Sequence, residues 1–232
     1  MDITSYLIII IGIIIDALFI YNDDKYHNSL SIVLKTLASL AFVLLAFHLY
    51  KGKGLLVIIA LIFDMLGDFI LILRNRYKKY KDIIFACGTI SFFIAHILFA
   101  TYLIGLNGEC IKWGIVINII LYIIIAIAFK LSLDVKGFIG ILGACYLFII
   151  MFNSGLSITN YHLVPTHENF VYMVGSLIFI SSDLVLTLHK FGKNSPDFLQ
   201  IAYRVLYYVS QIILALYIGL LPQSEIYIFL NI

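Results

Sequence analysis

The chain has 232 residues, of which 63% are hydrophobic and only 12% charged, and its mean hydropathy is +1.08. So few charges among so many Ile, Leu and Phe residues exclude a soluble globular domain of this length. The net charge of +2 does not indicate a nucleic-acid-binding protein, because the basic residues cluster beside the ends of apolar segments, where membrane topology signals are expected. The sequence predicts a protein that crosses a membrane several times.

Neither a metal centre nor a disulfide framework is expected. Cys87, Cys110 and Cys145 are odd in number and show no CxxC spacing, and no HExxH or comparable ligand spacing is present. The first apolar run lacks a basic leader and a small-x-small cleavage site, so it is interpreted as a helix of the protein. We therefore predict one membrane domain over residues 1–232, without a metal or other cofactor.

A helix needs about 20 apolar residues to cross a bilayer. Clusters of charged residues, Gly, Asn and Pro divide the chain into eight segments of suitable length. They predict helices over 4–21, 31–50, 54–73, 83–105, 111–130, 136–158, 168–189 and 198–221. The expected fold is an all-α polytopic membrane protein, a single bundle of about eight transmembrane helices, with an arrangement of two four-helix halves as one alternative.

The basic residues favour one orientation in the membrane. The loops after the first, third, fifth and seventh predicted helices share an excess of Lys and Arg: Lys25, Arg74, Arg76, Lys78, Lys79, Lys81, Lys130, Lys136, Lys190 and Lys193. The other loops contain only Lys51, Lys53 and Lys112. Because cytoplasmic loops are enriched in basic residues, the first set is predicted to be cytoplasmic, with both termini on the other side. We expect an integral, multi-pass protein of the plasma membrane.

Two apolar stretches each place an aspartate directly after a small residue. They are 61–68, which ends in Gly67-Asp68, and 177–183, which ends in Ser182-Asp183. An Asp at the centre of a membrane helix costs roughly 2.5–3.5 kcal/mol on insertion scales, so such a residue is a candidate functional group. The two carboxyl groups are the first candidates for a site.

Several charged side chains are expected at one depth. At 1.5 Å per residue, five side chains lie roughly 6–9 Å inside the predicted cytoplasmic boundary: Asp16, Lys35, Asp68, Asp183 and Arg204. Three polar residues, His96, Asn153 and Gln211, lie nearer the midplane. If the layer forms one site, the carboxyl groups of Asp68 and Asp183 must converge on one cavity.

Each candidate also has a structural interpretation. Asp68 and Asp183 could form ion pairs with Lys35 or Arg204 that only fix helix packing. Asp64, one turn below Asp68 on the same face, could be a second acid or a hydrogen-bonding group between helices. The side chain of His96 could carry protons or lie in the core. The basic run 74–81 could set topology or attract anionic lipid.

An internal repeat is a further hypothesis. Asp68 and Asp183 are separated by 115 residues, and so are His96 and Gln211. A duplication of four helices would explain both spacings and would give two parallel halves.

The chain resembles the YhhN-like family of membrane lysoplasmalogenases. The residues that support the resemblance follow one another in order along the chain: Lys35, Gly67-Asp68, Phe85-x2-Gly88-x3-Phe92-x3-His96, Tyr146-x4-Met151, Gly175-x3-Phe179-x2-Ser182-Asp183 and Tyr207-Tyr208-x2-Gln211. The resemblance implies hydrolysis of the vinyl ether bond of lysoplasmalogen to a fatty aldehyde and a glycerophospho-ethanolamine or -choline. The implied partners are this lysophospholipid and membrane lipid, and no oligomeric state is predicted.

On this hypothesis Asp68 and Asp183 share general acid and base catalysis, as the two carboxyl groups of glycosidases do. His96 is the third predicted catalytic residue. The predicted substrate-binding residues are Lys35 and Arg204, which would hold the phosphate, together with Asp64, Tyr146, Asn153, Ser182, Tyr207 and Gln211. The sequence does not say which Asp is the acid.

Two other classes of function stay open. Intramembrane carboxyl groups are equally natural as ion or proton relays in a small-solute or ion transporter. A lipid-binding or receptor-like protein without catalysis is the third interpretation. A closed pocket that contains both carboxyl groups favours an enzyme, whereas a path open alternately to both sides favours transport.

Overall fold

The computed structural model describes residues 2–25, 29–132, 137–192 and 196–222. Within these ranges the chain forms eight long helices: α1 (Ile3–Lys25), α2 (Ser29–Leu49), α3 (Leu55–Ile72), α4 (Lys81–Leu106), α5 (Cys110–Ser132), α6 (Gly137–Leu163), α7 (His167–Phe191) and α8 (Phe198–Leu220). Each contains a segment long and apolar enough to cross a membrane. The predicted all-α, multi-pass architecture is confirmed.

Two short 3₁₀ helices, η1 (Leu73–Asn75) and η2 (Lys78–Tyr80), form the connection between α3 and α4. This connection lies at the predicted cytoplasmic end, where the chain also passes from α1 to α2, from α5 to α6 and from α7 to α8. Lys136 and Lys193, two of the residues that support this orientation, lie outside the described residues.

The predicted helix ends are wrong at two informative places. Helix α6 continues five residues beyond the predicted end at 158, because its polar last turns find partners inside the protein. Thr159 Oγ1 donates to the Gly155 carbonyl at 2.9 Å, and Asn160 Nδ2 donates to Asn169 Oδ1 of α7 at 3.1 Å. Helix α1 also continues beyond the predicted end at 21, to Lys25, which brings Asp23 into the bundle.

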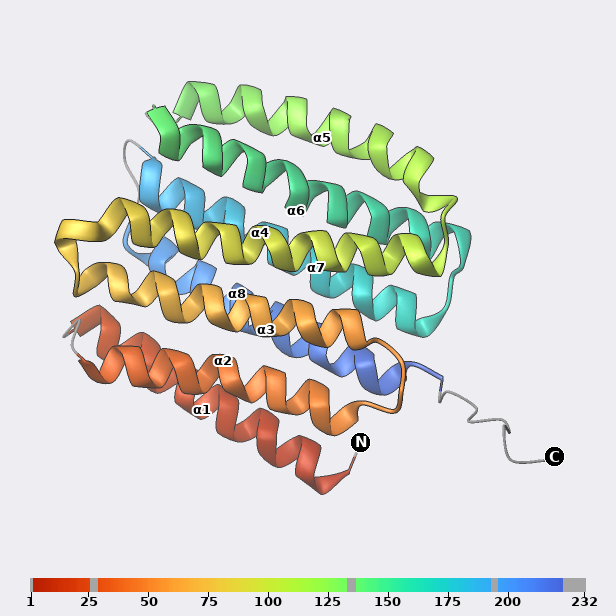
Figure 1. The fold of residues 1–232 in the computed structure, drawn as a ribbon, viewed down its shortest axis with the longest axis horizontal. Helices are drawn as coiled ribbons and strands as arrows, with labels where there is room; N and C mark the ends of the chain where they lie inside the picture. The colour runs from red at the N-terminus through yellow and green to blue at the C-terminus, as the bar shows by residue number, and fades with distance from the viewer. Residues whose placement is uncertain (1, 26–28, 133–136, 193–195, 223–232) are drawn as a thin grey trace.

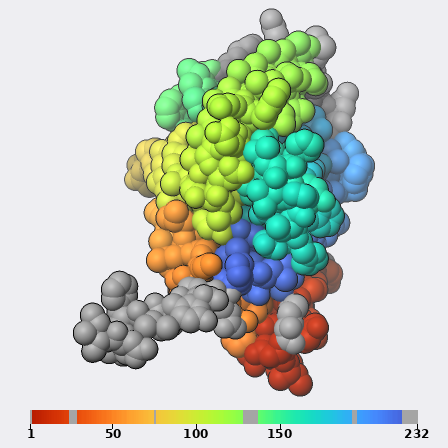
Figure 2. Space-filling model, turned by 90° about the vertical axis from the view of Figure 1, so that its right-hand side faces the viewer, coloured from red at the N-terminus to blue at the C-terminus, as the bar shows by residue number. Residues whose placement is uncertain are grey.

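Helices that follow one another along the chain are antiparallel, and six helices form a closed circuit in which the pairs α4–α6 and α8–α2 are parallel (Figure 1). Going round it, α2 packs on α3, α3 on α4, α4 on α6, α6 on α7, α7 on α8, and α8 returns to α2. Helices α1 and α5 lie outside the circuit, on α2 and α6 respectively. Seen from the end of the bundle, these two helices occupy opposite edges of the molecule (Figure 2).

The packing pattern repeats after four helices. Each helix can be replaced by the one four places further on, with α1 counted after α8. The contacts α1–α2, α2–α3 and α2–α8 then become α5–α6, α6–α7 and α6–α4, which the structure also contains. The hydroxyl groups of Tyr102 in α4 and Tyr217 in α8, which are 115 residues apart, form a hydrogen bond of 2.7 Å. This arrangement supports the hypothesis of two parallel four-helix halves.

Helices α3 and α4 approach closely where two glycines face large side chains. A Cβ atom built on Gly67 would lie 2.6 Å from Cε2 of Phe92, and one on Gly88 would lie 2.5 Å from Cδ2 of Leu71. Phe92 has little room to move, because its ring packs against Tyr146 and Tyr207. The glycines therefore set the spacing that brings Asp68, next to Gly67, towards the α4 aromatic ring.

At the opposite end of the bundle, Asp2 connects the start of α1 with the end of α2. Its Oδ1 accepts hydrogen bonds from the Ser5 hydroxyl at 2.7 Å and the Ser5 backbone at 3.0 Å, and His48 Nε2 lies 3.0 Å from Oδ2. The hydroxyl of Ser5, then its backbone N–H, then His48 hold the pKa of the Asp2 carboxyl below its usual value. This contact caps α1 at the end of the bundle away from Asp68 and Asp183.

The α3–α4 contact predicts a stability effect. The substitution Gly67→Ala should lower the free energy of unfolding by about 1–3 kcal/mol, because the methyl group overpacks against the Phe92 ring. The matched control is Gly105→Ala in α4, where a Cβ would meet no atom within 4 Å. Thermal unfolding in detergent, followed by size-exclusion chromatography, measures both variants. Equal or higher thermal stability of Gly67→Ala would show that the spacing is not set there.

Candidate functional site

A cavity of about 890 Å³ occupies the half of the bundle nearest the predicted cytoplasmic end. All eight helices and η1 contribute to its wall. Asp68 and Asp183 both line it, so the prediction that these two residues converge on one cavity is confirmed. The other predicted residues on the wall are Lys35, Tyr146, Ser182, Arg204 and Tyr207.

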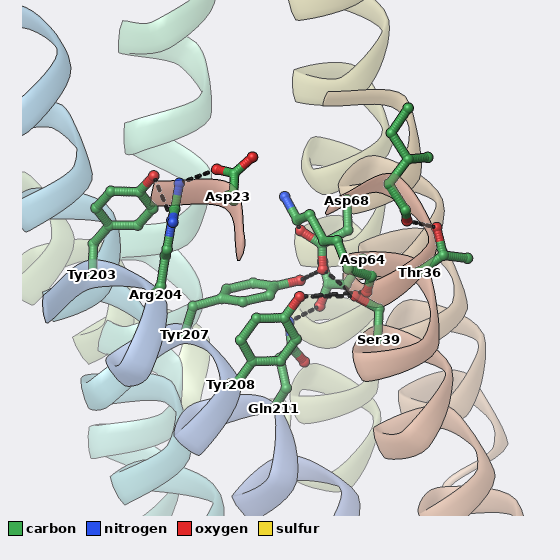
Figure 3. A network of polar contacts seen from close by, with 12 residues as sticks. Asp23, Thr36, Ser39, Asp64, Asp68, Tyr203, Arg204, Tyr207, Tyr208 and Gln211 are labelled. Carbon is green, nitrogen blue, oxygen red and sulfur yellow. Dashed lines mark hydrogen bonds and ion pairs between the residues drawn. The ribbon is translucent and has the colours of Figure 1, made fainter. Parts of the chain in front are cut away.

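Asp68 is held by side chains from two other helices (Figure 3). Lys35 Nζ of α2 lies 2.9 Å from Oδ1. Ser39 Oγ of α2 donates to Oδ2 at 2.6 Å, and the Tyr207 hydroxyl of α8 donates to the same oxygen at 2.8 Å. Because Lys35 and Ser39 are four residues apart, they share one face of α2. One cation and two hydroxyl donors thus compensate a negative charge on Asp68.

Asp183 has different surroundings. The Tyr146 hydroxyl of α6 donates to its Oδ2 at 2.5 Å. Within the described part of the chain, its carboxyl group makes no ion pair and accepts no other side-chain hydrogen bond. A buried carboxyl group without a cation favours the neutral, protonated form, because an uncompensated charge is costly in an apolar medium. The carboxyl groups of Asp68 and Asp183 therefore differ in what stabilises them.

The aromatic ring of Phe92 lies between the two Asp–Tyr pairs. Its centroid is 6.4 Å from that of Tyr146 and 6.1 Å from that of Tyr207. Both tyrosines are thereby fixed by packing as well as by their hydrogen bonds to Asp183 and Asp68. The three packed rings therefore hold the tyrosine hydroxyl groups in place beside the carboxyl groups of Asp68 and Asp183.

Arg204 lines the cavity, but it pairs with Asp23 of α1 rather than with an aspartate of the predicted layer (Figure 3). Its guanidinium group also lies 5.1 Å from the ring centroid of Phe19. The interpretation of Arg204 as the partner of Asp68 or Asp183 is therefore wrong. It failed because the predicted first helix ended at residue 21, two residues before Asp23. The proposed contact of Arg204 with phosphate stays a prediction.

Four predicted residues lie outside the cavity wall, deeper in the bundle: Asp64, His96, Asn153 and Gln211. Gln211 Nε2 donates to Asp64 Oδ2 at 2.8 Å, which connects α8 with α3. His96 is buried among rings, 4.6 Å from the Phe179 centroid and 6.0 Å from that of Tyr146. Within the described residues its ring nitrogens have no hydrogen-bond partner. These residues form a second layer behind the carboxyl groups.

Ser182 lines the cavity, yet its hydroxyl group donates to the backbone carbonyl of Tyr203 at 2.8 Å. This bond joins α7 to α8 directly beside Asp183. The hydroxyl proton is thus occupied in helix packing, and Ser182 acts on the cavity chiefly by fixing the position of its neighbour.

Sequence reasoning missed Ser39, Asp23 and Tyr208, which all belong to the site or to its ion pairs. A signal existed for Ser39, since it lies one helical turn after Lys35. Tyr208 stands beside the predicted Tyr207. Asp23 gave no signal, because it lay in a presumed loop.

The described residues contain no group of three or more His, Cys, Asp or Glu side chains that could hold a metal ion. The cavity wall contains Asp68, whose charge is compensated by Lys35 and two hydroxyl groups, and Asp183, which has no cation as a partner among the described residues. That combination is suited to proton transfer, in which one group donates and the other accepts.

The sequence model of the YhhN family matches residues 30–218, from the start of α2 nearly to the end of α8. The match includes Asp68, Asp183 and every side chain that contacts their carboxyl groups through a hydrogen bond or ion pair described above, whereas Asp23 of the same wall precedes it. No solved structure matches the chain. With most of its length covered by the family match, the chain belongs to the YhhN family.

Proposed function

We propose that the protein is a membrane hydrolase that cleaves the vinyl ether bond of lysoplasmalogen and releases a fatty aldehyde and a glycerophospho-ethanolamine or -choline. The observation that carries the proposal is the pair of unlike carboxyl groups, Asp68 and Asp183, on one cavity. Family membership is consistent with this activity.

Asp183 is the proposed general acid. A vinyl ether is activated by protonation of its β-carbon, which leaves an oxocarbenium ion at the carbon bonded to oxygen. A protonated carboxyl group without a cation nearby is the better donor of the two, and the 2.5 Å hydrogen bond from Tyr146 fixes its orientation. After the transfer, Tyr146 stabilises the new Asp183 carboxylate by the same bond.

Asp68 is the proposed general base. As a carboxylate it stabilises the oxocarbenium ion electrostatically, and it accepts a proton from the water that attacks this ion. The product is a hemiacetal. In its collapse, the hemiacetal hydroxyl returns a proton to Asp183, the glycerol C–O bond breaks, and Asp68 protonates the departing oxygen. Both carboxyl groups end in their starting forms.

The shape of the cavity favours an enzyme over a transporter. Its wall contains no residue between 93 and 121 or between 151 and 181, the segments that fill the opposite half of the bundle. In that half, Phe99, Tyr172 and Tyr217 are almost fully buried and pack against one another. A pocket closed on one side suits a substrate that enters and leaves through the same membrane leaflet.

Both carboxyl groups should be essential. Asp183→Asn and Asp68→Asn should each lower aldehyde release from lysoplasmalogen by at least about a hundredfold, which is the scale of general acid–base catalysis. Asp82→Asn, at the exposed start of α4, is the matched control and should keep full activity. Since Asp68→Asn leaves Lys35 unpaired, the double variant K35Q/D68N should be folded and equally inactive. Full activity in either single variant contradicts the assignment.

The Asp–Tyr contact should affect rate more than binding. Tyr146→Phe removes the hydroxyl that orients Asp183, so kcat should fall roughly tenfold or more while KM changes little. Tyr161→Phe in the same helix, far from the cavity wall, is the control. A large rise in KM with unchanged kcat would instead indicate that Tyr146 binds substrate.

The proposed carbon protonation leaves an isotopic signature. In D₂O the released aldehyde should contain one deuterium on the carbon next to the carbonyl group, and turnover should be slower, because the proton comes from an exchangeable carboxyl group. Mass spectrometry of the aldehyde measures this, and preformed aldehyde incubated with the protein corrects for later exchange. Aldehyde without deuterium would exclude protonation of the vinyl ether as the first step.

A further inference from the structure

Two cations on the cavity wall, Arg74 and Lys190, are not used by the proposed chemistry. The other two on the wall are occupied, Lys35 by Asp68 and Arg204 by Asp23. Within the described part of the chain, Arg74 and Lys190 form no ion pair. The guanidinium group of Arg74 lies 5.2 Å from the ring centroid of Phe85, another wall residue, which steadies it beside the cavity. The two side chains are therefore available to an anionic ligand.

Arg74 and Lys190 stand at similar distances along the chain from the two proposed catalytic carboxyl groups. Arg74 follows Asp68 by six residues and Lys190 follows Asp183 by seven, which is roughly 9–11 Å towards the predicted cytoplasmic end. Each cation thus stands above one carboxyl group on the same stretch of chain. An anion between the cations would lie about that far from a group held between the carboxyls.

A lysophospholipid has a matching separation. Six or seven bonds of roughly 1.5 Å join its vinyl ether carbons to phosphorus, so the two groups lie roughly 7–9 Å apart when extended. Phosphate oxygens accept charge-assisted hydrogen bonds from guanidinium and ammonium groups. With the phosphate between Arg74 and Lys190, the vinyl ether reaches the two carboxyl groups.

The wall formed by α5 and α6 is mostly apolar, and small residues leave room between its larger side chains: Ala126, Gly140, Gly143 and Ala144. A Cβ built on Gly143 would meet no atom within 4 Å, which leaves open space there. Ile141 lines the cavity although 67% of the residue is exposed, so the cavity continues to the outer surface of the bundle at this point. A hydrocarbon chain can lie along this wall and extend into the bilayer.

We propose that Arg74 and Lys190, in place of the paired Lys35 and Arg204, bind the phosphate of a lysophospholipid whose hydrocarbon chain lies along the α5–α6 wall. The proposal names the substrate class of the same site and so rests on the proposed function. Its test uses binding of an ether lipid that cannot be hydrolysed, so that a failure of catalysis and a failure of phosphate binding are distinguishable.

Three probes separate the contributions of chain and phosphate. They are 1-O-hexadecyl-glycerophosphocholine, 1-O-hexadecylglycerol, which lacks the phosphate, and glycerophosphocholine, which lacks the chain. Native mass spectrometry of the full-length protein measures the bound fraction at increasing concentration of each probe. The phosphate-bearing lipid should bind tightest, and higher salt should weaken it, because ionic contacts at a partly exposed site are screened.

The variants are Arg74→Gln, Lys190→Gln and the double variant R74Q/K190Q. The double variant should bind 1-O-hexadecyl-glycerophosphocholine about tenfold more weakly and bind 1-O-hexadecylglycerol unchanged. Arg74→Lys keeps the charge and should retain most of the affinity. The matched controls are Arg76→Gln and Lys79→Gln, which change exposed cations of the same loop outside the cavity wall and should have no effect.

Each outcome is decisive. An unchanged affinity for the phosphate-bearing lipid in the double variant, or an equal loss for both lipids, overturns the assignment to phosphate. Glycerophosphocholine binding as tightly as the lipid overturns the placement of the chain and makes the ligand a soluble phosphodiester. Selective loss for the phosphate-bearing lipid supports the proposal even if the wild-type protein releases no aldehyde, in which case only the proposed reaction is wrong.

Discussion

The structure depends on the cost of a carboxylate inside an apolar bundle. Asp68 can be charged there only because a cation and two hydroxyl groups reach it from neighbouring helices. Lys35 and Ser39 come from α2 and Tyr207 from α8, so one side chain of α3 joins two consecutive helices to a third that is far away in sequence. The polar contacts that make the charge tolerable also close the circuit of helices.

The second carboxyl group shows what happens without that compensation. Asp183 lies on the same cavity and has the same chemistry, yet its described contact is a single tyrosine hydroxyl. Asp68 and Asp183 thus receive different roles in the proposed reaction from their neighbours and not from their residue type. The paired carboxyl groups of glycosidases are distinguished by their environments in the same way. Phe92, between the two tyrosines, keeps the pairs separate and rigid.

The two halves of the bundle share their packing but not their polar chemistry. Tyr102 and Tyr217, 115 residues apart, meet and hydrogen-bond where the halves face each other. In contrast, the residue 115 positions after Lys35 is Ile150, so the cation that compensates Asp68 has no counterpart beside Asp183. A repeated arrangement of helices with different side chains thus provides two carboxyl groups at similar depth in unlike surroundings.

The number of helices and the common layer of Asp68 and Asp183 could be predicted from the residues, because span length and the cost of buried charge can be evaluated along a single chain. Which charges pair depends on contacts between helices, and these are seen only in the folded bundle. Arg204 meets Asp23 instead of a residue of the predicted layer, since α1 is longer than its apolar pattern indicates. His96 lies behind the cavity wall, because the direction of a side chain depends on how α4 is rotated against its neighbours, and no pattern within one helix specifies that rotation.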